Sequence, residues 1–239
     1  MTKPWRLLVL GASGAIGTTV VDHASRDGWQ VVAVSRTERS TSKHDGIEWL
    51  HYDPLDDADP RLVFEGQQPF DGVCFAQGAN VTDSLATFDL AGHLDLYRAN
   101  CLSVVVASAM LVEAGLLREG GARIVVVSSI WQERARTNKL SYTMTKAAIG
   151  GFVRSASVDL GADGHLVNGV LPGVLDTPMT RSQLSDEQIS RVCDKTMVGR
   201  LPDLATLADT IIFLCSERNT SISGQSLAVD LGMSNANLL

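Results

Sequence analysis

Short runs of consecutive hydrophobic residues, rich in β-branched side chains, alternate along the chain with longer segments of helical periodicity. Consecutive rather than alternating hydrophobic positions are typical of parallel strands that are buried on both faces of a sheet. Such runs predict strands at Arg6–Leu10, Val31–Ser35, Ile47–Tyr52, Gly72–Ala76, Arg123–Ser128, Leu166–Leu171 and Ser226–Val229. The helical segments predict helices at Ala15–Asp27, Gly92–Ala114, Ser141–Gly161 and Leu204–Ser216.

The alternation of strand and helix predicts βαβ units with right-handed crossovers. The expected fold is therefore a Rossmann-type, doubly wound α/β fold with a mainly seven-stranded parallel sheet and helices on both faces. No stretch has the composition of a linker, so residues 1–239 are expected to form a single domain. Residues 176–201 lie between a predicted strand and a predicted helix, and we expect them to form a substrate lid, since long insertions at strand ends often carry function.

Composition and charge exclude several classes of protein and partner. Of the 239 residues, 45% are hydrophobic, which is too large a fraction for a disordered chain. The formal net charge of -7, without a stripe of Lys or Arg, argues against nucleic acid. No window approaches the ~20 apolar residues of a membrane span, and the four scattered cysteines lack metal-ligand spacing. We expect a soluble cytoplasmic protein with no membrane partner and no metal.

A glycine-rich turn follows the first predicted strand and opens the first predicted helix. Gly11, Gly14 and Gly17 have the spacing of a dinucleotide-binding turn, in which the helix N-terminus offers free N–H groups to phosphate. The first glycine permits the tight turn, the second lets backbone approach a pyrophosphate, and the third lets the helix pack near the strand. A glycine-rich loop without a ligand is the alternative. The expected cofactor contacts of the turn are Gly11, Ser13, Gly14, Ala15, Ile16 and Gly17.

The end of the second predicted strand bears on the choice of dinucleotide. An NAD-binding turn usually places Asp or Glu here for the ribose 2′-hydroxyl, whereas this chain has Ser35 followed by Arg36, with Arg39 nearby. A guanidinium can hold a 2′-phosphate through two hydrogen bonds, so the sequence favours NADP(H), with NAD(H) as the alternative. Glu38 argues the other way, because its carboxylate could neutralise Arg36 or contact the ribose.

Tyr142 and Lys146 stand four residues apart in a predicted helix, which puts both side chains on one helix face. A nearby ammonium favours tyrosinate and is expected to lower the phenol pKa from about 10 toward working pH. A tyrosine tuned in this way can exchange a proton with a carbonyl oxygen or an alcohol. Ser129 stands thirteen residues upstream, at the carboxyl end of a buried strand, where ligands bind in such sheets. Ser128 is the alternative hydroxyl, and the spacing favours Ser129.

Together these motifs resemble those of the classical short-chain dehydrogenase/reductase family, in particular the 3-oxoacyl-reductase-like carbonyl reductases. The resemblance covers essentially the whole chain and implies a small-molecule carbonyl or alcohol substrate and a homodimer or homotetramer. Its features occur in order: the turn Gly11–Gly17, Asp53, Asn100, Ser129, Tyr142, Lys146, Pro172, Gly173 and Thr177.

The resemblance also implies roles for individual residues. Tyr142 would be the general acid/base, Lys146 would hold the nicotinamide ribose hydroxyls, and Ser129 would hydrogen-bond the substrate carbonyl oxygen. Asn100 would fix a water that connects Lys146 to solvent, although without the family it reads as a core amide. Asp53 would contact the adenine, although by itself it reads as a turn residue. The other cofactor contacts expected are Ser35, Arg36, Ala76, Gln77, Gly78, Tyr142, Lys146, Pro172, Gly173 and Thr177.

Three positions depart from the family pattern. Leu10 replaces the usual Thr, and the pair Gly14-Ala15 shifts the second glycine one residue earlier. The third departure is at the end of the fourth strand, where Ala76-Gln77-Gly78 replaces Asn-Ala-Gly. The Asn normally braces the central sheet, so Gln77 either substitutes for it or reaches the cofactor. These departures bear on cofactor affinity more than on catalysis.

The favoured function is that of an NADP(H)-dependent oxidoreductase that interconverts a ketone or aldehyde and an alcohol. A catalytically idle scaffold or redox sensor is the first alternative, but such a protein is expected to lose the Tyr, Lys or Ser. A sugar-nucleotide epimerase or dehydratase is the second, and those relatives generally carry a larger C-terminal substrate region. In the loop after Ser129, Trp131 is expected to stack a ring or form an apolar wall, and Arg134 or Arg136 to meet an anionic substrate. Loop packing and solvated charge are the alternative reading of that loop.

Overall fold

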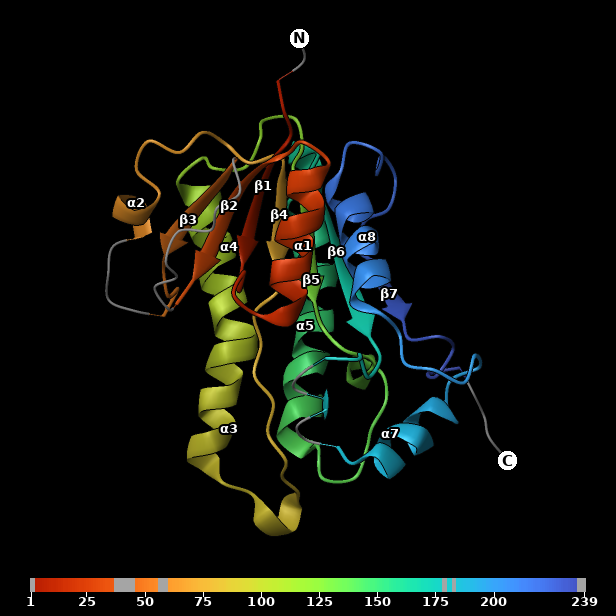
Figure 1. Ribbon diagram of the computed structural model, residues 1–239. Helices are drawn as coiled ribbons and strands as arrows, with labels where there is room; N and C mark the ends of the chain where they lie inside the picture. Colours follow the sequence, from red (N-terminus) through yellow and green to blue (C-terminus); the bar gives the residue numbers. More distant parts are fainter. Residues whose placement is uncertain (1–2, 37–45, 56–59, 178–179, 182–183, 236–239) are drawn as a thin grey trace.

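Seven parallel strands form one sheet in the computed structural model, which describes residues 3–36, 46–55, 60–177, 180–181 and 184–235 (Figure 1). The strand order is β3-β2-β1-β4-β5-β6-β7, so the order reverses between β1 and β4. The strands are β1 Arg6–Leu10, β2 Gln30–Ser35, β3 Ile47–His51, β4 Gly72–Phe75, β5 Arg123–Val127, β6 Leu166–Pro172 and β7 Ser226–Val229. The predicted doubly wound α/β fold is confirmed, with strand ends shifted by one residue at most.

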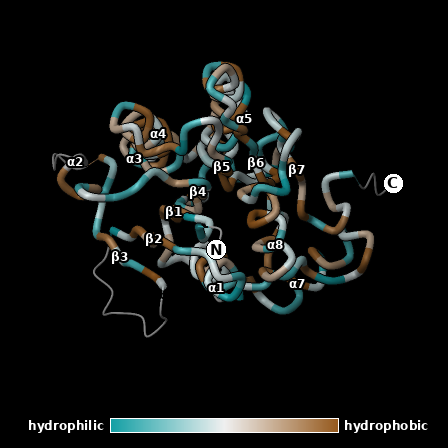
Figure 2. The backbone as a smooth tube through the Cα atoms, turned by 90° about the horizontal axis from the view of Figure 1, so that it is seen from above, coloured by the Kyte–Doolittle hydropathy of each residue, from teal (hydrophilic) through white to brown (hydrophobic). Residues whose placement is uncertain are grey.

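Helices cover both faces of the sheet, as Figure 2 shows from above: α3, α4 and α5 lie on one side, and α1 and α8 lie on the other. The main helices are α1 Ala15–Arg26, α3 Leu90–Tyr97, α4 Ser103–Glu113, α5 Leu140–Asp159, α7 Asp186–Cys193 and α8 Leu204–Cys215. Shorter elements are α2 Pro60–Val63 and the 3₁₀ turns η1 Leu85–Thr87, η3 Ile130–Gln132 and η4 Gly161–Asp163. The single helix predicted at Gly92–Ala114 is instead α3, a π-helical turn at Arg98–Leu102 (η2), and α4.

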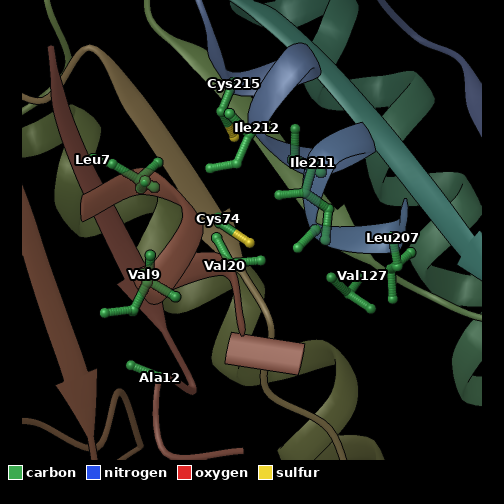
Figure 3. Close-up of a cluster of buried hydrophobic side chains, with 14 of the residues drawn as sticks. Leu7, Val9, Ala12, Val20, Cys74, Val127, Leu207, Ile211, Ile212 and Cys215 are labelled. Carbon is green, nitrogen blue, oxygen red and sulfur yellow. The ribbon is translucent and has the colours of Figure 1, made fainter. Parts of the chain in front are cut away.

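Two apolar layers hold the helices to the sheet. Val9 of β1 and Cys74 of β4 face α1 and α8, whereas Leu8 faces the layer of α4 and α5. Figure 3 shows the first layer, with Ile211 of α8 close to these strands. Because each central strand contributes to both layers, its hydrophobic positions are consecutive, which is the pattern read from the sequence.

The sequence reading that no window approaches a membrane span does not hold for one continuous helical stretch among the described residues, Leu90–Glu113, which is long and apolar enough to cross a membrane by length and composition alone. One side of this stretch packs on the sheet through buried residues such as Ala107 and Leu111. Its other side leaves Leu94 and Val105 about half exposed, at 48% and 45%. The apolar composition therefore serves the core on one side and leaves an uncovered apolar face on the other.

Candidate active site

The carboxyl ends of all the strands lie at one end of the sheet. Helix α3, the first turns of α5, and α7 extend beyond the sheet at this end (Figure 1). In doubly wound sheets, ligands bind at this end where the strand order reverses. Here the reversal lies between β1 and β4. The glycine turn after β1 and the segment Ala76–Gly78 after β4 are therefore neighbours.

Two glycines of the turn occupy positions that admit no side chain. Gly11 has a φ of +78°, and a Cβ there would lie 2.5 Å from the backbone nitrogen of Gln77. A Cβ on Gly17 would lie 2.3 Å from the carbonyl oxygen of Gly11. Both contacts are shorter than van der Waals contact with backbone, so the tight turn and the close helix packing require glycine.

Helix α1 begins with its N-terminal N–H groups free of side-chain caps. Gly14 is the N-cap, no side chain caps the helix, and its first turn contains no acidic residue. An uncapped helix N-terminus combines free donors with the positive end of the helix dipole. Beside it lies a cavity of about 230 Å³ that brings together most of the expected cofactor contacts. They are Gly11, Ser13, Gly14, Ser35, Arg36, Asp53, Ala76, Gln77 and Gly78.

Several polar groups that line this cavity come from the glycine turn, β2 and the segment after β3. The Ser35 hydroxyl donates to Ser13 Oγ at 3.0 Å. Arg36 Nη1 lies 3.7 Å from Asp53 Oδ2, and its side chain is 69% exposed. Asp53 also accepts from the Leu55 N–H at 3.0 Å, as a turn residue does. Glu38 and Arg39 lie outside the described residues.

Gln77 carries a side-chain amide whose two polar atoms are both buried without a hydrogen-bond partner in the described part of the chain. An unpaired buried polar group costs about 1–3 kcal/mol. Gln77 therefore does not brace the sheet in place of the usual Asn, and Ala76 packs its methyl group against the apolar layer of α1 and α8. The orphaned amide, the glycine cradle and the uncapped helix fit a dinucleotide phosphate.

The catalytic candidates meet at the end of β5. Ser129 follows the strand, and its side chain forms a hydrogen bond with Tyr142 of α5. Lys146 Nζ lies 5.6 Å from the centroid of the Tyr142 ring and donates to the Val127 carbonyl at 3.3 Å. Ser128 turns the other way, and its hydroxyl donates to the Lys146 carbonyl at 3.5 Å. The structure thus brings Ser129, rather than Ser128, to Tyr142.

The charges of this cluster differ from expectation. Burial raises the pKa of Tyr142 above its usual 10.0, and the hydrogen bond with Ser129 opposes that rise. The prediction of a lowered Tyr142 pKa is wrong for this structure, because the cost of burying the phenolate outweighs the stabilisation that the nearby Lys146 ammonium could give it. Burial lowers the pKa of Lys146 itself to about 8, while the Cys101 thiol opposes that change.

Asn100 lies in the π-helical turn between α3 and α4. Its Oδ1 accepts from the Ala79 N–H at 2.7 Å, and its Nδ2 donates to the Ala79 carbonyl at 3.0 Å and to Thr145 Oγ1 at 3.0 Å. A π turn inside a helix often marks a functional position. The amide joins three segments as a core residue would, and Oδ1 retains one acceptor position. A Cβ on Gly78 would lie 3.5 Å from both Asn100 Oδ1 and Lys146 Nζ, so these groups converge there.

Two further residues near Tyr142, Asp83 and Lys139, were not anticipated from the sequence. Asp83 is buried, and its carboxylate accepts from the Ser141 N–H at 3.0 Å and from the Ser141 hydroxyl. Since that hydroxyl has one proton, His93 Nδ1, at 2.8 Å, donates to Ser141 Oγ. Lys139 Nζ donates to Asn80 Oδ1, to the Val81 carbonyl and to Thr82 Oγ1 at 2.9, 3.0 and 3.2 Å. These bonds tie residues 80–83 to the start of α5, directly before Tyr142.

The remaining expected contacts lie at the end of β6. Pro172 ends that strand, and the Gly173 N–H donates to the Val229 carbonyl at 3.1 Å. Thr177 Oγ1 accepts from the Thr180 N–H at 3.1 Å. The segment 176–201, expected as a lid, contains α7, which the sequence did not predict. Within the described ranges, no group of three or more His, Cys, Asp or Glu residues could hold a metal ion.

Comparison with known proteins gives matches along nearly the whole chain. A family model described as enoyl-(acyl carrier protein) reductase matches residues 11–234. L-xylulose reductase of Bos taurus is 31% identical over 240 residues, which cover 95% of each chain. Gluconate 5-dehydrogenase of Gluconobacter oxydans (strain 621H) is 29% identical over 241 residues, which cover 95% of this chain and 94% of that protein.

A solved structure shares the fold over nearly the whole chain. The gluconate 5-dehydrogenase from Burkholderia cenocepacia, in complex with NADP and tartrate, superposes with a TM-score of 0.87 at 24% identity. The match covers 98% of this chain and 97% of that one.

Proposed function

Because the chain belongs to the short-chain dehydrogenase/reductase family, and is therefore an oxidoreductase, we propose that it interconverts a ketone or aldehyde and an alcohol by hydride transfer with NADP(H). The observation that carries the proposal is the cluster of Ser129, Tyr142 and Lys146 beside the cavity of the glycine turn. Tyr142 as proton donor and Ser129 as hydrogen-bond donor to a carbonyl oxygen would then lie next to a site suited to a dinucleotide.

The cofactor would be held by residues of the glycine turn, β2 and the segment after β4. The free N–H groups of α1 would meet the pyrophosphate, and Arg36 with the hydroxyls of Ser13 and Ser35 would meet a 2′-phosphate. When bound, the nicotinamide supplies or accepts the hydride. The structurally similar gluconate 5-dehydrogenase with bound NADP supports the NADP(H) preference, and NAD(H) is the alternative.

Tyr142 would act as the general acid in the direction of reduction. Burial keeps its phenol protonated at neutral pH, which suits proton donation to a developing alkoxide. Ser129 would orient the carbonyl oxygen by a hydrogen bond and stabilise its developing charge. Lys146, a cation below pH 8, would offset the negative charge left on Tyr142. Asn100 would hold a water on its remaining acceptor position and connect Lys146 to solvent.

The assembly and location follow from the same resemblance and from exposed apolar surface. A homodimer or homotetramer would cover the uncovered face of α3 and α4, where Leu94 and Val105 are exposed. A cytoplasmic location suits the free, buried thiols of Cys74 and Cys215. Residues 176–201 would act as the lid over the substrate.

Cofactor binding followed by turnover tests the proposal. Quenching of tryptophan fluorescence should show tighter binding of NADPH than of NADH, and Arg36→Ala should remove the difference. A panel of neutral ketones and aldehydes should then oxidise NADPH. Absence of dinucleotide binding would refute the proposal outright, and NADPH binding without turnover of any carbonyl would point instead to an idle scaffold or sensor.

A further inference from the structure

A second cavity, of about 460 Å³, lies between the loop that follows Ser129 and helix α7. Its volume is in the range of small-molecule sites. Trp131 and Val174 line one side of it, and Met233 contributes from the end of the described chain. Residues from four separate segments therefore surround this space.

The cavity adjoins the catalytic cluster. The N–H of Trp131 donates to Ser129 Oγ at 3.3 Å, and that hydroxyl group also bonds with Tyr142. Val174 follows Gly173, which lies at the end of β6. A carbonyl compound whose oxygen is held by Ser129 would thus extend into this cavity past Trp131.

The charged residues that line the cavity are all cations. Arg136 comes from the loop after Ser129, Arg191 from α7, and Lys195 from the residues that follow α7. The described lining contains no Asp or Glu, although the whole chain has a net charge of -7. The three side chains belong to solvent-exposed residues, so an anion could reach them without a change of fold.

Two of these three cations differ from the cations around them, which are paired with carboxylates. Arg181 is bound by Asp176 through two hydrogen bonds of 2.7 and 2.6 Å, and Arg191 by Glu187 one helical turn earlier. Arg136 and Lys195, by contrast, have no carboxylate within 4.0 Å among the described residues. The positive charge of Arg136 also contributes to the lowered pKa of Lys139, after burial. The cavity thus carries positive charge that the described part of the chain leaves unneutralised.

We propose, on the basis of the proposed function, that the substrate is a carbonyl compound carrying a remote carboxylate or phosphate group. Arg136 and Lys195 bind that anion, whereas Arg191 is already paired with Glu187 and lines the wall of the cavity. A guanidinium binds either group through paired hydrogen bonds, and an ammonium binds it as a point charge. Trp131 and Met233 cover the apolar part of the molecule between the anion and the carbonyl. Arg134, which lies in the same loop but does not line the cavity, takes no part.

Matched pairs of charged and neutral substrates test the proposal. Straight-chain oxo acids of increasing length are compared with their methyl esters, and hydroxyketone phosphates with the free hydroxyketones. We expect at least one charged member to exceed its neutral counterpart about 10-fold in kcat/KM. Arg136→Gln and Lys195→Gln should raise KM for that anion with little change in kcat, and should leave the neutral compound unaffected. Arg134→Gln is the matched control and should change neither.

A binding measurement separates this proposal from the proposed function. Calorimetric titration of the same pairs into the NADPH-loaded Tyr142→Phe variant should show tighter binding of the anion, weakened by salt and by Arg136→Gln. Anion binding without turnover in the native enzyme would refute the proposed function and leave the anion site standing. Turnover of neutral ketones, with no charged compound bound more tightly than its neutral partner, would refute the anion site alone. The oxo-acid series and the hydroxyketone-phosphate series are compared separately, which shows whether the bound anion is a carboxylate or a phosphate.

Discussion

Replacement of Lys146 by Met should stabilise the folded chain while removing its activity. Lys146 is buried, with an exposed fraction of 4%, and its pKa falls from 10.5 to about 8 mainly because burial disfavours the ammonium. A methionine of similar length fills the same space without a charge.

The size of the effect follows from the two pKa values. At 1.36 kcal/mol for each pH unit, a fall from 10.5 to about 8 corresponds to about 3 kcal/mol at neutral pH. Loss of the bond from Lys146 to the Val127 carbonyl would offset about 1 kcal/mol of this. We therefore expect Lys146→Met to raise the free energy of unfolding by about 2 kcal/mol near pH 6.5.

The pH dependence identifies the cause. Below pH 8, Lys146 is protonated in both states, and the folded state bears the whole penalty of the buried charge. As the pH rises from 8 toward 10.5, the folded state releases its proton first, so native stability increases relative to the variant. The advantage of the variant should shrink by about 2 kcal/mol by about pH 9.5.

Urea unfolding of both proteins at several pH values measures the difference. The comparison with the variant removes the contributions of the buried thiols and phenols, which titrate in the same range. A stability difference that stays constant between about pH 6.5 and 9.5 would show that Lys146 carries no depressed pKa, and would contradict the account of its burial.

Three further predictions concern the groups around the site. Asp83→Ala should leave the Ser141 N–H unpaired and destabilise the fold by about 2 kcal/mol in urea unfolding. It should lower kcat and change KM less, because Tyr142 loses its fixed position. Unchanged kcat would refute the positioning role. Gly17→Ala should abolish NADPH binding in fluorescence titration, since its Cβ would lie 2.3 Å from a backbone oxygen, whereas Gly151→Ala meets open space and should add about 0.5–1 kcal/mol of stability. Gln77→Leu should weaken NADPH binding without lowering the melting temperature of the free protein, because its amide has no partner to lose in the described chain; unchanged affinity would show that the amide does not reach the cofactor.

Local features of the fold were readable from the sequence. β1 was predicted because it is buried on both faces, so that its hydrophobic run alone marks it as a central parallel strand. Helix α7 was missed because its few apolar positions are half-buried rather than buried. The capping box formed by Ser185 and Gln188 at its start is a signal that could have revealed it.

Features that depend on distant contacts were not readable. The π-helical turn at Asn100 accompanies hydrogen bonds of its side chain with Ala79, in the loop after β4. Asp83 stands 58 residues from Ser141, so no spacing rule links them. The direction of the Tyr142 pKa was mistaken because the spacing to Lys146 shows that the two are neighbours, while the depth of burial is a property of the whole fold.

Tyr142 is proposed to transfer a proton during reduction of a carbonyl by NADPH. The direct measurement is kcat of Tyr142→Phe on the best carbonyl substrate, together with its dissociation constant for NADPH. We expect a fall in kcat of about 10²–10⁴-fold with nearly unchanged NADPH affinity. Turnover within a few-fold of the native enzyme would contradict it and remove Tyr142 from the chemistry.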